Sequence, residues 1–321
     1  MAHKILGSTN NDNFHNRIDI DCGLSEVGLL NTGLALNLNY ERFQRMDYYW
    51  GKLEKDVELE LPSWMKRYFM ETTFLITASK SVCAMSNYYN TISQNKETSI
   101  HDSLIKESDE FLGCIIGYLN SIIWFSMIPK FVKYLPEISH YTNKTKKQVE
   151  WLKSSLLNIV KTQREEIDGK PDEELAPDML KMFLTLNTSR DITKGVADGL
   201  NHHSMSDVEI SLNLIEIITA GIDTSANSAC YAIYMISKYP HVKEKFLKEL
   251  DTVLGRGQNF QITYEGINKL AYCEAVIKEG IHKHRSNWTD PDVFNPNRFM
   301  DESHPDYKKE VYMFGGGSRK C

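Results

Sequence analysis

Eight residues at the end of the chain combine backbone freedom, a cationic side chain and a thiol. They read Phe314-Gly315-Gly316-Gly317-Ser318-Arg319-Lys320-Cys321. Consecutive glycines permit positive φ angles and a close approach to a flat ligand, and their backbone N–H groups can converge on one anionic atom. A thiolate is a soft, strongly donating ligand that suits iron, and Arg319 can pair with a nearby carboxylate. The alternative interpretation is a flexible glycine-rich tail that carries an unrelated cysteine.

A second group of residues that could do chemistry has the sequence Ala220-Gly221-Ile222-Asp223-Thr224-Ser225. Its threonine, Thr224, lies 97 positions before Cys321. On a helix, Ala220 and Thr224 share one face, and small side chains there, with Gly221 beside them, leave room for a large flat ligand. Thr224 can hydrogen-bond the Ala220 carbonyl oxygen and open the helix locally. Asp223 lies among isoleucines, so its carboxylate should have a partner or hold its proton more tightly. The alternative is helix packing through small residues, with Asp223 at an exposed edge.

Together, and in this order, the two patterns resemble motifs of the cytochrome P450 family. The first resembles the haem-binding loop, Phe-x-x-Gly-x-Arg-x-Cys, and the second resembles the oxygen-activating motif. The resemblance implies that haem b is the cofactor, that Cys321 ligates the iron, that Phe314 packs beside the sulfur and that Arg319 pairs with a haem propionate. It also implies that Thr224 hydrogen-bonds dioxygen at the haem and that Asp223 helps to relay protons. Cleavage of the O–O bond requires protons in a pocket that is otherwise dry.

Two further segments resemble the part of the family that supports the cysteine loop. Lys269–Glu279 resembles the helix of the family's Glu-x-x-Arg pair, in which Glu279 matches the glutamate, but position 282 is a histidine. Trp288–Phe299 resembles the segment that supplies a second arginine, here Arg298. The resemblance implies that Glu279 and Arg298 belong to a buried network that fixes the loop. The alternative interpretation of Glu279 is an acidic residue at the exposed end of a helix.

The chain departs from the family pattern in length. Only 42 positions separate Glu279 from Cys321, fewer than the family's intervening strands require, so we expect a deletion that joins Glu279 to Gly280. We also expect the chain to be truncated at both ends relative to the family. Removal of one partner from a buried ion pair costs about 3–5 kcal/mol, and a helix after the cysteine would stabilise the thiolate. Weak haem retention and a lower haem potential are therefore expected.

Helical periodicity dominates the chain, and the strand signals are weak. We expect helices near Asn39–Lys55, Ser63–Asn87, Ile105–Met127, Thr145–Asp168, Asp178–Asn187, Asp207–Lys238, His241–Leu254 and Tyr264–Glu279, and one short strand at Gln258–Thr263. A capping box at Ser206 and Glu209 predicts the start of the long central helix, and Pro240 predicts its end. The predicted fold is mainly α, with a small, incomplete sheet, and is P450-like in part. Residues 1–60 form a poorly matched segment and residues 61–321 a partial haem domain.

Composition narrows the classes of protein. A hydrophobic fraction of 41% and a charged fraction of 25% indicate a globular protein, and the net charge of −6 argues against a nucleic-acid binder. Six scattered cysteines without a Cys-x-x-Cys pair argue against a zinc site or a disulfide framework. No signal peptide or N-terminal anchor is expected. Phe111–Ile128 is long enough to span a membrane, but we favour a buried helix or one that touches a membrane surface.

The resemblance implies a haem-thiolate monooxygenase that inserts one oxygen atom from dioxygen into a hydrophobic small molecule. An NADPH-dependent reductase would supply the electrons, aided by Lys308, Lys309 and Lys320. Intact members of the family would lie at the cytosolic face of the endoplasmic reticulum membrane. This chain, for which no N-terminal anchor is expected, would be cytoplasmic. One alternative is a non-catalytic remnant or an incomplete gene model with weak or no haem binding. Another is a helical interaction protein whose motifs are coincidental.

Overall fold

The computed structural model describes residues 36, 38–54, 57–97, 105, 107–127, 129, 132, 135–171, 178–186, 188–191, 204–256, 262–281 and 288–307. Residues 38–52 are helical. The elements that follow are α3 (Leu61–Ala78), α4 (Ala84–Ile92), α5 (Ser108–Met127), α6 (Pro136–Asp168), α7 (Met179–Thr185), α8 (Asp207–Lys238), α9 (Pro240–Leu254), α10 (Tyr264–Ile267), α11 (Ala271–Ile281) and the 3₁₀ helix η4 (Pro296–Phe299). The expectation of a mainly helical protein is confirmed. The described ranges contain no strand, and most of the expected strand at 258–263 lies outside them.

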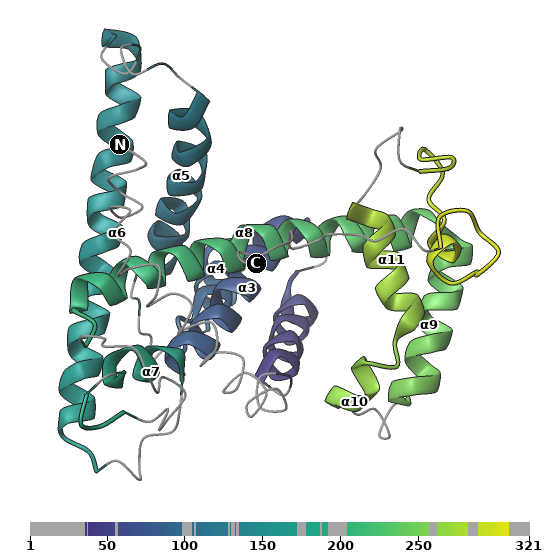
Figure 1. Cartoon of the computed structure of the whole chain (residues 1–321), viewed down its shortest axis with the longest axis horizontal. Helices are drawn as coiled ribbons and strands as arrows, with labels where there is room; N and C mark the ends of the chain where they lie inside the picture. The colour runs from purple at the N-terminus through teal and green to yellow at the C-terminus, as the bar shows by residue number, and fades with distance from the viewer. Residues whose placement is uncertain are drawn as a thin grey trace. The chain divides into compact units, whose positions relative to one another are not determined.

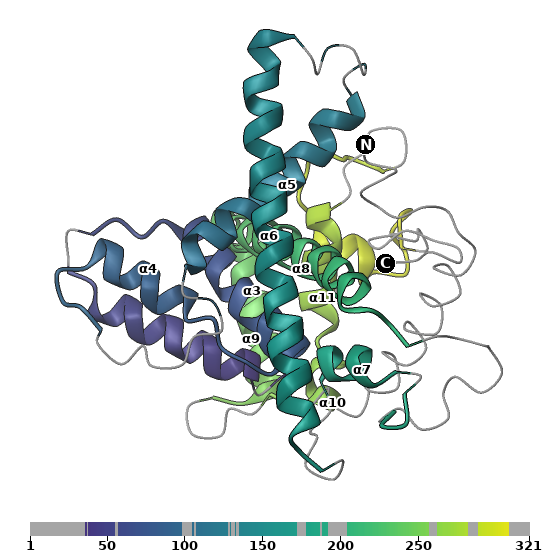
Figure 2. The same ribbon diagram turned by 90° about the vertical axis from the view of Figure 1, so that its left-hand side faces the viewer.

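Two compact units make up the chain, residues 1–226 and residues 227–321. In the first unit, α5 packs along α6, and α3 packs against α4, α5 and α7 (Figures 1 and 2). Apolar side chains from these helices and from the first part of α8 form one core, among them Phe74, Phe111, Leu156 and Ile218. Each of these four side chains is at most 1% exposed, so burial of this core supplies the main driving force for folding of the unit.

The second unit consists of the end of α8, α9, α10, α11 and η4. In Figure 1, α11 lies beside α9. The 3₁₀ helix η4 packs on α11. The small core contains Met235, Val242, Tyr272, Val276 and Phe294, and the Phe294 ring stacks on Tyr239 with 5.2 Å between ring centroids. This core fixes α11, which carries Glu279, against the segment that carries Arg298.

Helix α8 begins and ends where the sequence predicts, at Asp207 and Lys238. The capping box forms reciprocally: the Ser206 N–H donates to the Glu209 carboxylate at 2.9 Å, and the Glu209 N–H donates to the Ser206 hydroxyl at 3.3 Å. These bonds satisfy backbone donors that the first turn leaves without helical partners. The middle of the helix is buried on one side, where Ile218 and Ile222 are fully covered.

Two of the expected helices are each interrupted. Ser63–Asn87 is α3 followed by α4, because Ser79 and Cys83 adopt left-handed backbone angles, with φ of 51° and 49°. Neither residue is a glycine, so the sequence has no signal for this turn. The Glu71 carboxylate stabilises the start of α4, because it accepts the Met85 N–H at 2.8 Å in the first turn of that helix.

Tyr264–Glu279 is likewise α10 followed by α11. Thr263 caps α10 by accepting the Gly266 N–H at 3.0 Å. Glu249 of α9 accepts the N–H groups of Tyr272 and Cys273, both at 2.8 Å, at the start of α11. A carboxylate at a helix N-terminus satisfies free donors and complements the helix dipole. Glu249 therefore sets the position at which α11 begins, and with it the position of Glu279.

Helix α5 is, among the described residues, the one helix long and apolar enough to cross a membrane by length and composition. One side of it packs into the core, where Phe111, Ile115 and Tyr118 are at most 5% exposed. Its C-terminal end is open: the exposed fractions of Trp124 and Met127 are 50% and 79%. Helix α6 begins at Pro136, nine residues before the expected start, with the proline in its first turn, where a missing N–H costs nothing.

Candidate functional site

The predicted oxygen-activating motif lies in the middle of α8, within the first unit. Ala220 and Thr224 are exposed on one face of the helix, while Ile222 between them in sequence is fully buried. The Thr224 hydroxyl donates to the Ala220 carbonyl oxygen at 2.5 Å, the local bond that the sequence predicts. The face that carries both residues is therefore open and lined by small side chains, which a flat apolar ligand could cover without displacing a large residue.

Asp223 and Gly221 both face α3. The Asp223 carboxylate pairs with the Lys66 ammonium at 3.1 Å, and about a quarter of each side chain is exposed. The expectation that Asp223 has a partner is thus confirmed. A Cβ atom built on Gly221 would lie 3.0 Å from the Thr73 hydroxyl oxygen, so this glycine allows α3 and α8 to approach closely. Its predicted role beside the cofactor stays a prediction.

The predicted cysteine loop lies outside the described residues. This applies to Phe314, Gly315, Gly317, Arg319 and Cys321. The described ranges also contain no cluster of three or more histidine, cysteine or acidic side chains that could hold a metal ion. Of the residues expected to support the loop, the structure describes Glu279 and Arg298, and both belong to one network of polar contacts.

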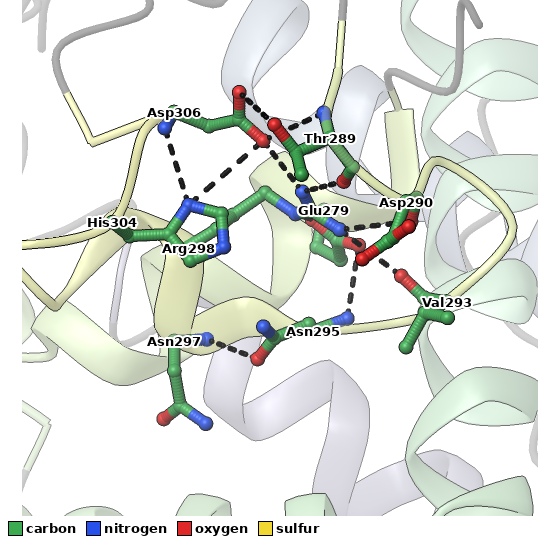
Figure 3. Close-up of polar contacts among 9 residues, drawn as sticks. All are labelled: Glu279, Thr289, Asp290, Val293, Asn295, Asn297, Arg298, His304 and Asp306. Carbon is green, nitrogen blue, oxygen red and sulfur yellow. Dashed lines mark hydrogen bonds and ion pairs between the residues drawn. The ribbon is translucent and has the colours of Figure 1, made fainter.

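Glu279 and Arg298 form a buried ion pair, as expected (Figure 3). The distance from Arg298 Nε to Glu279 Oε2 is 2.7 Å, and each side chain is 3% exposed. The other carboxylate oxygen, Glu279 Oε1, accepts the Asn295 backbone N–H at 2.9 Å. Glu279 thus joins α11 to the 295–298 segment through a charge-assisted bond and a backbone bond. The alternative of an exposed helix-end acid is wrong for this residue.

Asp306 is a second carboxylate on the same arginine, and the sequence analysis missed it. Its Oδ2 lies 2.8 Å from Arg298 Nη1, and its side chain is fully buried. Figure 3 shows it on the side of the guanidinium away from Asn295, where it also accepts the Thr289 N–H at 3.0 Å. Asp306 follows a polar run with two other acids, Asp301 and Glu302, and nothing in that run distinguishes the one that becomes buried.

Backbone oxygens occupy the remaining donors of the guanidinium. Nη1 also donates to the Thr289 carbonyl oxygen at 2.7 Å, and Nη2 donates to the carbonyl oxygens of Val293 at 3.1 Å and Asp290 at 3.4 Å. All five N–H groups of Arg298 therefore have acceptors. With no donor left for a ligand, Arg298 acts on the fold of this segment and not directly on a cofactor.

A separate hollow of about 430 Å³ lies between the end of α8 and α11 in the second unit. Tyr231, Met235, Val276 and Gly280 are among the residues that line it. The lining is mainly apolar, and among the described residues it contains no acid, lysine, arginine, histidine or cysteine. Its polar side chains are those of Asn227, Ser228 and Tyr231, none of which belongs to the predicted motifs.

Comparison with known proteins identifies the family to which the sequence is similar. A family model described as Cytochrome P450 matches residues 49–281. The chain is 22% identical over 207 residues to Cytochrome P450 3A6 of Oryctolagus cuniculus, with 52% of this chain and 40% of that protein covered. It is 24% identical over 328 residues to Cytochrome P450 6B2 of Helicoverpa armigera, with 86% and 58% covered. The chain thus spans less than two thirds of the length of these curated relatives.

The fold is similar to that of a solved cytochrome P450. The structure matches the crystal structure of the cytochrome P450DA heme domain with a TM-score of 0.65 and 16% sequence identity, over 95% of this chain and 65% of that one. At this identity the likeness concerns the fold alone. The family model, by contrast, covers more than half of the chain in sequence. We conclude that this chain belongs to the cytochrome P450 family.

Proposed function

We propose that the protein is a haem-thiolate monooxygenase that inserts one oxygen atom from dioxygen into a hydrophobic small molecule. The observation that carries the proposal is the open face of α8, where Thr224 presents a hydroxyl beside Ala220. A hydroxyl next to a small apolar side chain suits a site that must bind a flat cofactor and still handle protons. Family membership supports this activity in general terms.

Membership in the family implies haem, and therefore iron, as the cofactor. The described residues fit it on the α8 side, because the exposed pair Ala220 and Thr224 leaves space that larger side chains would fill. Cys321 would ligate the iron as a thiolate, and Gly315 and Gly317 would let backbone N–H groups approach the sulfur. Phe314 would cover the sulfur and Arg319 would bind a propionate. These five roles rest on the family resemblance.

When bound, haem supplies the activation of dioxygen, and the chain's own residues supply the protons. The Thr224 Oγ1 can accept a hydrogen bond on the open face while its own proton is held by the Ala220 carbonyl oxygen. To pass that proton on, the hydroxyl would release the Ala220 carbonyl and accept a replacement proton at Oγ1. Asp223 lies next to it in sequence, with 27% of its side chain exposed, so its carboxylate can exchange protons with water. Lys66 pairs with that carboxylate at 3.1 Å and so holds it beside α3.

The proposed partners follow from this chemistry. Electrons would come from an NADPH-dependent reductase, oxygen from O₂, and the second substrate would be a hydrophobic small molecule. Nucleic acid is not among the proposed partners, because the net charge is −6.

The proposed location is the cytosolic face of the endoplasmic reticulum membrane. Support comes from the end of α5 and the start of α6, which lie together at one extremity of the first unit in Figure 1. Trp124, Met127 and Leu135 are exposed there, and Lys144 and Lys146 are exposed about two to three turns farther along α6. Aromatic and apolar side chains next to lysines are typical of surfaces that bind anionic lipid. Binding to vesicles that contain phosphatidylserine, weakened in W124S, would test this location.

A carbon monoxide spectrum tests the main proposal. The chain is expressed with haem supplied, reduced and exposed to carbon monoxide, and a red-shifted Soret band is expected from thiolate ligation. C321S should abolish this band, whereas C230S should keep it, because Cys230 lies in α8 outside the predicted motifs. A histidine-like band, or no haem, in the unaltered chain would favour the alternative of a non-catalytic remnant.

A second experiment tests the role of Thr224. With reductase, NADPH and lauric acid as a hydrophobic probe, T224A should divert oxygen to hydrogen peroxide and lower the hydroxylated product per oxygen consumed by about tenfold or more. T252A is the matched control, because Thr252 is also exposed and also donates to the carbonyl oxygen four residues earlier, at 2.7 Å. Equal product yields in the two variants would contradict the proposed role.

A further inference from the structure

Asp306, Arg298 and Thr289 form a closed ring of polar contacts. Asp306 accepts from Arg298 Nη1 at 2.8 Å and from the Thr289 N–H at 3.0 Å, while Arg298 Nη1 also donates to the Thr289 carbonyl oxygen at 2.7 Å. The Thr289 hydroxyl adds a longer bond of 3.4 Å to the second carboxylate oxygen. A fully buried carboxylate with these donors ties the end of the 288–307 segment to its beginning.

His304 shapes the approach to Asp306 without acting as its counter-ion. The Asp306 N–H donates to His304 Nδ1 at 3.1 Å. A ring nitrogen that accepts a hydrogen bond carries no proton, so the 3.9 Å separation between His304 Nδ1 and Asp306 Oδ2 is not an ion pair while this bond lasts. The positive charge that faces the Asp306 carboxylate, among the residues drawn in Figure 3, is that of Arg298.

We propose that Asp306 is a positioning residue that, through Arg298, clamps the approach to the cysteine loop onto α11. It lies 15 residues before Cys321, whereas Arg298 lies 23 residues before it. Glu279 holds the arginine from α11, and Asp306 holds it from the end of the 288–307 segment. Its consequence for the thiolate rests on the proposed function, but the clamp itself does not require haem.

Chain length alone would give Asp306 only a small effect. An anchor 15 residues from the cysteine, in place of one 23 residues away, changes the equilibrium constant for holding the cysteine in place by a factor of about two. Loss of a buried carboxylate that satisfies three donors should be larger, about tenfold to a hundredfold in local opening. The size of the effect therefore separates a clamp from a mere tether.

Amide hydrogen exchange on the full chain without haem tests the clamp. In D306A, exchange of the Thr289 N–H and of peptides within 288–307 should accelerate about tenfold to a hundredfold. In D306N, the amide oxygen can still accept from Arg298 and Thr289, so only the charge is lost and the acceleration should be smaller. D301N is the matched control, because Asp301 lies in the same segment, is exposed, and its carboxylate accepts from the Ser303 N–H and hydroxyl.

The outcomes are distinct. Exchange in D306A equal to that in D301N would overturn the clamp. Acceleration that extends to α3 and α5 would mean that D306A misfolds generally. The exchange of the 288–307 segment in D306N, which keeps the shape of the side chain, would then decide between clamp and no clamp. If the haem-loaded chain has a thiolate band, D306A should shift it toward the histidine-like form, and an unchanged band would overturn the link to the cysteine. If the unaltered chain has no thiolate band, the proposed function fails, and the exchange data still decide the clamp.

Discussion

Substitution of Arg298 by lysine perturbs the buried network most cleanly. Lysine keeps the positive charge and a long apolar stem, so the electrostatic pairing with Glu279 and Asp306 is retained in principle. What changes is geometry, since an ammonium has three N–H donors and a guanidinium has five in a fixed fork. The structure shows all five donors of Arg298 in use, on two carboxylates and three backbone carbonyl oxygens.

The expected cost follows from that count. At least two of the five hydrogen bonds that Arg298 donates are lost in R298K, and a hydrogen bond to a charged group contributes about 1–3 kcal/mol. The sum is about 2–6 kcal/mol, the range expected for damage to a buried ion pair. Since about 1.4 kcal/mol corresponds to a factor of ten in an equilibrium constant, local opening of the segment should rise about 30-fold or more.

Amide hydrogen exchange measures this quantity where it arises. The Asn295 N–H, which donates to Glu279, and the Thr289 N–H, which donates to Asp306, report on the two sides of the arginine. R256K is the matched control in the same unit, because Arg256 pairs with Asp251 while 79% of its side chain is exposed. Exposed pairs contribute little to stability, so R256K should leave exchange in the 288–307 segment unchanged.

Equal exchange in R298K and the unaltered chain would refute this reasoning. It would mean that water or a shift of the backbone satisfies the acceptors that lysine cannot reach. Acceleration at Asn295 without acceleration at Thr289 would be a partial failure, since it would show that the Asp306 side of the network does not depend on the fork geometry of Arg298.

Three further predictions concern other parts of the scaffold. S206A should lower the free energy of unfolding by about 0.5–2 kcal/mol in urea titrations, because it removes the N-cap of α8, whereas S154A, in the middle of α6, should have little effect. E249Q should destabilise α11 by about 0.5–2 kcal/mol, since Glu249 accepts two of its first N–H groups, and E244Q on the exposed side of α9 is its control. Burial, followed by the nearby Glu249 carboxylate, raises the pKa of the Cys273 thiol from 9.0 to about 12. The folded chain then keeps a proton that the unfolded chain loses, so stability should fall as the pH rises from about 9 to about 12, and C273A should lack that part of the decline.

The elements with strong local signals could be predicted from the sequence. Helix α8 has a capping box at one end and Pro240 at the other, and both of its bounds are confirmed. The bond from Thr224 to Ala220 and the pairing of Glu279 with Arg298 are confirmed as well. Each of these features depends on residues close together in the sequence or on a family motif, so the spacing of residues along the chain was sufficient to predict it.

The features that could not be predicted depend on contacts between distant segments. The turn between α3 and α4 uses left-handed Ser79 and Cys83 and is stabilised by Glu71, which lies in α3. The break before α11 is stabilised by Glu249, 23 residues before the first amide that it binds. A polar side chain from another helix can satisfy the free N–H groups of a helix start as well as a local cap does. Local sequence therefore gives no sign of where these two helices begin.

Gly221 shows how one residue can satisfy two independent requirements. The family motif accounts for a small residue beside the cofactor face, but the structure directs the missing Cβ of Gly221 toward Thr73 of α3, at 3.0 Å. The open face belongs instead to Ala220 and Thr224. A larger residue at 221 would push α3 away from α8 and disturb the pairing of Lys66 with Asp223, since both contacts join the same two helices. The position of the proposed proton-relay acid is thus coupled to the packing of α3 on α8, and damage to that packing should impair proton delivery even where the cofactor face itself is unchanged.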